Sequence, residues 1–217
     1  MKVKSLILKD LYMAKATSRY VLLFVLGIEV MIAAKLLGNA SFWMVYTGVL
    51  AGSVPLSMLY YDLGGGWRGY SAALPLTAGQ LVSAKYLLGL MIGGSLFILS
   101  LLSQGGAALY TGAGVLQAMV EALGNALMAA LVCCLSTAFL LPLTIRFGVE
   151  RARAAYYILF GGMAGVFFVL IKVLPVRMPS LSVPTTGLWA ELLVLAAAVP
   201  LYVGSWMLSI AWYRRKG

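Results

Sequence analysis

Glu29 is an acidic residue within an apolar stretch of the sequence, which limits the states that its carboxyl group can adopt. It lies within the apolar run Tyr20–Leu37, where an ionised carboxylate inside a membrane costs several kcal/mol. Such a side chain must face the bundle interior, pair with a donor, or carry a proton. Two interpretations stay open: Glu29 lines a translocation path and contacts a cationic substrate, or it is a hydrogen-bonded packing residue. Asn125 is a weaker candidate for the same path.

The remaining side chains exclude several kinds of catalysis. The chain has 6 Asp and Glu and no His, so it lacks an imidazole base and a His-ligated zinc site. No Lys follows a Gly, which excludes the phosphate loop G-x-x-x-x-G-K-[ST]. We therefore expect no catalytic residue, no metal and no cofactor bound by this chain.

A polar segment, residues 62–85, is longer than a simple connector requires. It begins at Asp62 and ends at Lys85, and Thr77 can cap the helix that runs into the next apolar run. Exposed Trp67, Tyr70 and Leu74 would suit a docking surface, because aromatic residues are enriched at binding hot spots. The alternative is an ordinary loop whose aromatic residues lie among lipid headgroups.

A second polar segment is short and basic. It runs from Arg146 to Arg153, and its members of interest are Arg146, Phe147, Gly148, Glu150, Arg151 and Arg153. One interpretation is a positively charged membrane anchor, and the other is a second contact with a protein partner or with lipid phosphates.

The composition specifies the elements that position these residues. The 217-residue chain is 63% hydrophobic and 10% charged, whereas a soluble domain is about 45–50% apolar and about 25% charged. We predict an all-α polytopic membrane protein, a single transmembrane domain over residues 1–217. The predicted spans are residues 20–38, 42–61, 86–110, 118–145, 154–174 and 188–213. A moderately amphipathic interfacial helix, residues 1–19, precedes them, with Asp10 near its apolar side.

The basic residues predict the orientation. All but three of the 16 Lys and Arg fall on one side of the predicted spans, the exceptions being Lys35, Lys172 and Arg177. The positive-inside rule therefore places both termini in the cytoplasm. The net charge of +10 is explained by this topology and by contact with anionic lipids, so nucleic acid is not an expected partner. Gly89-x-x-x-Gly93 and Gly161-x-x-x-Gly165 favour close packing within the bundle, with a dimer seam as the alternative.

Two blocks of the sequence resemble the ABC-2-type transporter permeases, in particular short six-span bacterial permeases related to exporters of membrane-active peptides. The matching residues are Leu8-Lys9-Asp10-Leu11-Tyr12, Asp62, Trp67, Tyr70, Leu74-Pro75-Leu76-Thr77, Val82, Lys85-Tyr86, Pro142 and the run from Arg146 to Arg153. The sequence departs from the family pattern at Leu63, where an acidic residue is frequent, and at Ala78-Gly79-Gln80, which replaces a basic stretch.

The resemblance implies a plasma-membrane permease subunit that dimerises, with itself or with a related permease, and sits on separate ATPase subunits, which would bind ATP and Mg²⁺. A coupling helix around Ser71–Thr77 would then contact the ATPase. The residues assigned to coupling are Asp62, Trp67, Tyr70, Ser71, Leu74, Pro75, Leu76, Thr77 and Lys85.

The sequence also bears on three alternative functions: an intramembrane protease, a channel or secondary transporter, and a membrane scaffold. An intramembrane aspartyl protease needs two Asp within spans, whereas Asp10 and Asp62 lie at span boundaries. A passive channel or secondary transporter would carry more intramembrane ionisable groups or repeated halves. A membrane scaffold or immunity protein that works without an ATPase is a further alternative. Only the resemblance favours peptides as the exported substrate.

Overall fold

The computed structural model describes residues 2–36, 40–64, 77–111, 115–158 and 188–216. Its labelled elements are all helices: α1 (Lys2–Thr17), α2 (Arg19–Ala33), α3 (Ala40–Gly52), α4 (Val54–Gly64), α6 (Ala78–Thr111), α7 (Val115–Phe147) and α9 (Leu188–Lys216). Residues 149–158 form a further helical stretch. The fold of the described residues is therefore the all-helical one that the composition predicts.

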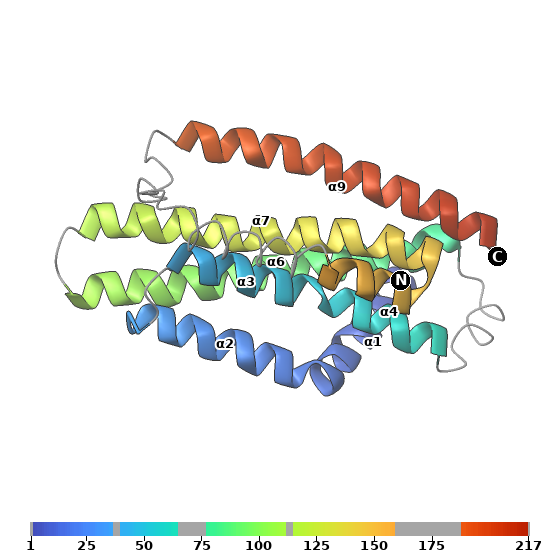
Figure 1. The fold of residues 1–217 in the computed structure, drawn as a ribbon, viewed down its shortest axis with the longest axis horizontal. Coiled ribbons are helices and arrows are strands. Elements are labelled where there is room, and N and C mark those ends of the chain that lie inside the picture. Colours follow the sequence, from blue (N-terminus) through green and yellow to red (C-terminus); the bar gives the residue numbers. More distant parts are fainter. Residues whose placement is uncertain (1, 37–39, 65–76, 112–114, 159–187, 217) are drawn as a thin grey trace.

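The bundle is organised around α7. This helix packs against α6, α3 and α9, while α2 packs against α3 and α6 on the other side of the bundle (Figure 1). The N-terminal helix α1 contacts α6, α2 and α4. Residues from the two ends of the sequence thereby reach the same end of the bundle (Figure 1).

Small residues let α3 and α6 approach α7 closely. A Cβ atom added at Gly48 on α3 would lie 2.6 Å from the carbonyl oxygen of Ala129, and one added at Gly89 on α6 would lie 2.6 Å from Cγ2 of Thr137. Both distances are shorter than van der Waals contact, so only glycine fits. The prediction that Gly89-x-x-x-Gly93 packs within the bundle is confirmed, whereas Gly161-x-x-x-Gly165 lies outside the described residues.

The second predicted span is broken into α3 and α4 at Ser53. Pro55, in the first turn of α4, has no N–H to donate to the carbonyl of Ala51, and its ring crowds that carbonyl. At the break, the Ser53 hydroxyl donates to the carbonyl of Leu50 over 2.7 Å. The two helices together still give a stretch, Phe42–Asp62, that is long and apolar enough to cross a membrane.

The first predicted span is shorter than expected. A bend of 73° separates α1 from α2, so the N-terminal segment forms a helix distinct from α2. Its position at the membrane interface stays a prediction. The helix α2 ends at Ala33 rather than near residue 38, because Lys35 adopts a left-handed conformation with φ 55°.

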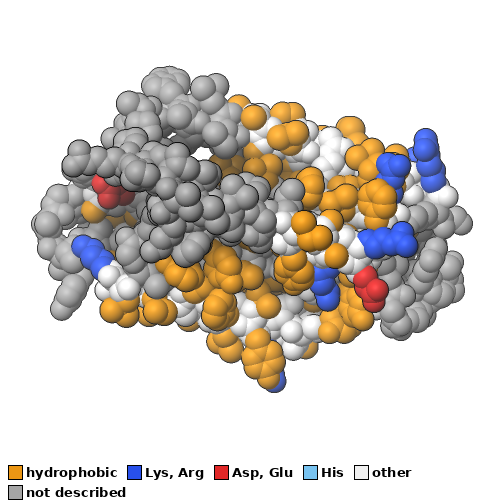
Figure 2. Space-filling model, in the orientation of Figure 1, with side chains coloured by type: hydrophobic (Ala, Val, Ile, Leu, Met, Phe, Trp, Pro, Cys, Tyr) orange, Lys and Arg blue, Asp and Glu red, His pale blue; other side chains and the backbone are white. Residues whose placement is uncertain are grey.

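Four helical stretches in the described part of the chain are long and apolar enough to cross a membrane: Phe42–Asp62, Ala78–Ala107, Ala118–Phe147 and Ala196–Arg215. The bent pair of α1 and α2 gives a fifth if it counts as one span. The predicted fifth span, residues 154–174, is described only up to residue 158, so the number six stays a prediction. Apolar side chains dominate the middle of the described surface, and most of the visible Lys and Arg side chains lie toward one end (Figure 2).

Candidate functional site

Four charged side chains meet where α1, α4 and α6 come together. We call Lys9, Asp10, Asp62 and Lys85 the four-charge cluster. Lys85 Nζ lies 2.7 Å from Asp10 Oδ1 and 2.5 Å from Asp62 Oδ2. Lys9 Nζ lies 2.7 Å from Asp62 Oδ1 and 3.3 Å from Asp10 Oδ1. Each lysine therefore contacts both carboxylates, and the cluster carries no net charge.

The cluster is mostly shielded from solvent. The side chain of Asp10 is 1% exposed and that of Lys85 is 7% exposed. Removing one partner of such a buried pair leaves an uncompensated charge, at a cost of about 3–5 kcal/mol. The four-charge cluster thus ties the N-terminal helix to the bundle through contacts that cannot be broken singly without penalty.

Asp10 explains the imperfect amphipathic pattern of the first helix. Leu6, Asp10 and Ala14 are spaced one turn apart and are all buried, so they form the inward face of α1. A carboxylate is accepted on this face because Lys9 and Lys85 neutralise it. Sequence reasoning did not assign Lys9 or Asp10 to a site. The signal was an acidic residue on the apolar side of a helix.

The predicted coupling segment is framed by this cluster. Asp62 lies near the end of α4 and Lys85 in the early turns of α6, so their ion pair brings the two ends of residues 62–85 together. The helices also extend into that segment from both sides, to Gly64 and from Ala78. The predicted coupling residues Trp67, Tyr70, Ser71, Leu74, Pro75 and Leu76 lie outside the described residues.

Thr77 caps α6, as predicted. Its hydroxyl accepts a hydrogen bond from the Gln80 backbone N–H over 3.3 Å, and its own N–H donates to Gln80 Oε1 over 3.1 Å. This reciprocal pair is a capping box, which satisfies two backbone donors that the start of a helix leaves free. Thr77 therefore fixes the residue at which the segment re-enters the helix.

The second predicted segment lies at the same end of the bundle as the C-terminus. The Arg146 guanidinium lies over the Trp212 ring at 4.7 Å, and Arg153 lies over the Tyr60 ring at 5.4 Å. Gly148 ends α7 with φ 89°, and its N–H donates to the carbonyl of Thr144. The side chains of Phe147, Glu150 and Arg151 are exposed.

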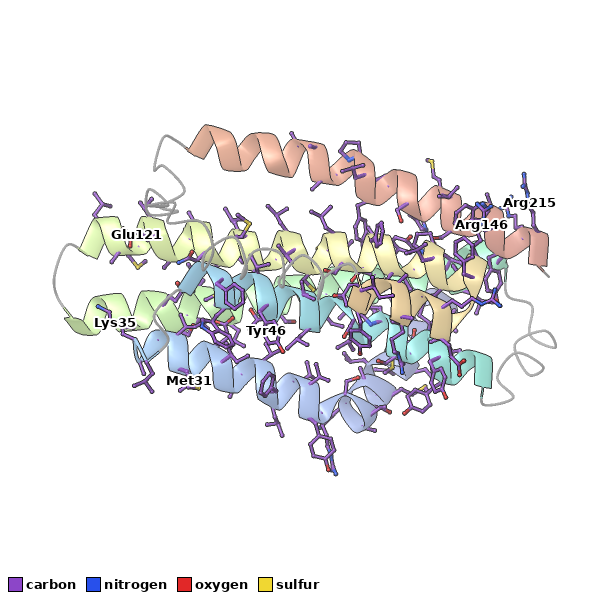
Figure 3. All side chains as sticks on the ribbon, in the orientation of Figure 1. Met31, Lys35, Tyr46, Glu121, Arg146 and Arg215 are labelled. Atoms are coloured by element: carbon purple, nitrogen blue, oxygen red, sulfur yellow. The ribbon has the colours of Figure 1, made fainter. Side chains whose placement is uncertain are left out.

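Opposite ends of the bundle differ in their charged residues. Arg146 and Arg215 lie at one end, whereas Lys35 and Glu121 lie at the other (Figure 3). This separation is what the predicted topology requires, since Lys35 is one of the three basic residues assigned to the far side. The arrangement places the second basic segment and the C-terminal arginines together.

Glu29 is enclosed among three helices of the bundle. Its side chain is fully buried between α2, α3 and α6, at 0% exposure. Ser100 Oγ donates to Glu29 Oε1 over 2.9 Å, Ser103 Oγ approaches Oε2 at 3.3 Å, and Thr47 Oγ1 approaches Oε1 at 3.5 Å. We call these four residues the Glu29 cluster. The three hydroxyl partners were not identified from the sequence.

Asn125 does not join that cluster directly. Its Nδ2 donates to Gln104 Oε1 over 2.9 Å, and Gln104 follows Ser103 on α6. The prediction that Glu29 and Asn125 line a translocation path is not tested by these contacts, which lie within one subunit.

Comparison with known proteins supplies the family. A family model described as ABC-2 family transporter protein matches residues 5–214. Neither the curated proteins nor the solved structures that were compared gave a match. The family is the membrane component of a transporter rather than its ATPase, and it implies an ABC-type ATPase subunit as partner. The chain therefore belongs to the ABC-2 family of transporter proteins, as a multi-pass membrane permease.

Proposed function

We propose that this permease is the transmembrane subunit of an exporter and that residues 62–85 couple it to a separate ATPase. The observation that supports the coupling most directly is the four-charge cluster. It joins the two ends of the segment through Asp62 and Lys85 and connects both of them to Asp10 on α1. A displacement of the segment would therefore move α1, α4 and α6 together.

The mechanism follows from that connection. Closure of the ATPase subunits on ATP would push on Ser71–Thr77 and tilt α4 and α6, opening a path toward the outside. The change requires the ATPase to bind one conformation of the permease more tightly than the other. ATP and Mg²⁺ belong to the partner subunit in this proposal. Arg146, Phe147, Gly148, Glu150, Arg151 and Arg153 would provide the second contact.

We propose further that the permease dimerises, with itself or with a related chain, in the plasma membrane. The outward side of α9 supports this, because it presents apolar residues such as Leu201 at 63% exposure and Met207 at 62% exposure. Such surfaces suit lipid or a second subunit. Both termini would face the cytoplasm, where the basic end of the bundle contacts anionic lipids.

The proposed substrate is an amphipathic or hydrophobic molecule such as a membrane-active peptide. The similarity to peptide-exporter permeases supports this class, as does the apolar bundle. Glu29 and Asn125 are proposed to lie along the path, which requires α2 to separate from α3 and α6 during transport.

The coupling proposal is tested by purifying the full chain from its native membrane in detergent, then identifying bound proteins and assaying ATP hydrolysis. We expect a phosphate-loop ATPase to co-purify. Replacing Trp67, Tyr70 and Leu74 with alanine should abolish that association. The matched control replaces Tyr20, Leu23 and Phe24 with alanine, because these α2 side chains have a similar composition and are exposed.

The control variant should retain the ATPase. Purification of the chain without any ATPase would contradict the proposal and favour the scaffold or channel alternatives. Retention of the ATPase by the first variant would place the contact elsewhere on the permease.

A further inference from the structure

Hydrogen atoms in the Glu29 cluster are too few to satisfy an ionised carboxylate. Each hydroxyl carries a single hydrogen and can donate it to one acceptor at a time. Thr47 Oγ1 lies 3.0 Å from the carbonyl oxygen of Met44 but 3.5 Å from Glu29 Oε1. Its hydrogen therefore has a nearer acceptor than the carboxylate.

The same comparison applies to Ser103. Its Oγ lies 3.1 Å from the carbonyl oxygen of Ser100 and 3.3 Å from Glu29 Oε2. The spacing of Ser100 and Ser103 places both side chains on one face of α6, so this back-bond is local to the helix. Ser100 Oγ is thus the hydroxyl that donates to Glu29 without a nearer acceptor, at 2.9 Å.

Charge compensation is also missing around Glu29. In the part of the chain that the structure describes, no Lys or Arg forms an ion pair with it. Lys35 and Glu121 lie at one end of the bundle (Figure 3). Other titratable residues on the neighbouring helices are engaged elsewhere. Arg19 of α2 donates a hydrogen bond to the Tyr20 hydroxyl, and Lys85 of α6 belongs to the four-charge cluster. Cys133 of α7 is a buried thiol in the same apolar core.

One protonation state satisfies every atom in this arrangement. A carboxylic acid has one O–H donor and retains acceptor capacity. Glu29 Oε1 then accepts from Ser100, and the proton on Oε2 donates to Ser103 Oγ. Ser103 in turn donates to the carbonyl of Ser100. The chain of hydrogen bonds closes without a charge in the apolar interior, where an isolated carboxylate is costly.

We infer that Glu29 is a proton-binding site inside the bundle, occupied in this conformation and held by Ser100 and Ser103. The proton leaves as a hydrated proton only when α2 separates from α3 and α6 and water reaches the carboxyl group. Binding of the proton therefore favours the closed packing of these three helices. The inference concerns contacts within one chain and does not depend on the proposed contact with an ATPase.

Infrared spectroscopy tests the protonation state directly on the purified full chain at neutral pH. The protein is prepared with ordinary glutamate and with carboxyl-labelled ¹³C-glutamate. We expect the carbonyl-stretch band of a protonated carboxylic acid, shifted by the label, which assigns it to Glu rather than to Asp10 or Asp62. This comparison needs no substitution, so it does not depend on the folding of a variant.

Two substitutions assign the band to a residue. Glu29→Gln preserves the pattern, because its amide oxygen accepts from Ser100 and its N–H donates to Ser103, and it should remove the band. Glu121→Gln replaces an exposed carboxylate and should leave the band unchanged. A neutral-pH spectrum with carboxylate bands and no labelled acid band would overturn the inference, as would an acid band that persists in Glu29→Gln.

Discussion

Lys85 on α6 reaches Asp10 on α1, with 2.7 Å between Nζ and Oδ1. Both side chains are nearly excluded from solvent. The same lysine contacts Asp62 at the end of α4. A single cation therefore joins the N-terminal helix to the two helices that flank the proposed coupling segment.

Replacing Asp10 with asparagine should destabilise the permease. The change leaves Lys85 buried with one of its two carboxylates, so the free energy of unfolding in mixed micelles should fall by about 3–5 kcal/mol. Lys15→Ala, at an exposed position on the same helix, should change it by less than about 1 kcal/mol.

The double variant Asp10→Asn with Lys85→Met separates the pair from the rest of the cluster. It should lose less stability than the sum of its two single variants, because the second change removes the unpaired cation. Additive losses would show that Asp10 and Lys85 do not interact.

Gly48→Ala should weaken the contact between α3 and α7. The added Cβ would lie 2.6 Å from a backbone oxygen, and overpacking of this kind costs about 1–3 kcal/mol. Gly27→Ala is the matched control, because nothing lies within 4 Å of its added Cβ. Thermal unfolding in detergent should show a lower midpoint for Gly48→Ala and no loss for Gly27→Ala. Equal midpoints would mean that α3 and α7 are not packed this closely.

Thr77→Ala should reduce stability by about 0.5–2 kcal/mol through loss of the cap on α6. Thr77→Ser retains the hydroxyl that accepts from Gln80 N–H, so it should behave like the unmodified protein in the same unfolding measurement. If both variants lost equal stability, the role of Thr77 would lie outside the capping box.

Local patterns in the sequence were sufficient for the helical class, for the cap at Thr77 and for the close packing at Gly89. Each of these depends on residues near one another or on overall composition. Asp62 and Lys85 are predicted from the sequence only as the two ends of a coupling segment. Their ion pair with each other depends on how α4 and α6 meet.

Contacts between helices depend on how the helices pack, which local sequence patterns do not specify. Asp10 lies on the apolar side of an amphipathic helix, and its ion pair with Lys85 depends on how α1 packs against α6. The break at Ser53 follows from Pro55, but apolar composition alone did not indicate it. The hydroxyl partners of Glu29 depend on the rotation of α3 and α6 about their axes, which a periodic pattern in one apolar segment does not specify.

Site-specific photocrosslinking tests the central claim, that residues 62–85 contact a partner ATPase, most directly. A photoreactive phenylalanine analogue is placed at Trp67 in the full chain in its native membrane, and at exposed Phe24 on α2 as the control. We predict that the Trp67 position crosslinks to a polypeptide with a phosphate loop and that the Phe24 position does not. Crosslinks from the Trp67 position to lipid or to copies of this chain alone would contradict the claim.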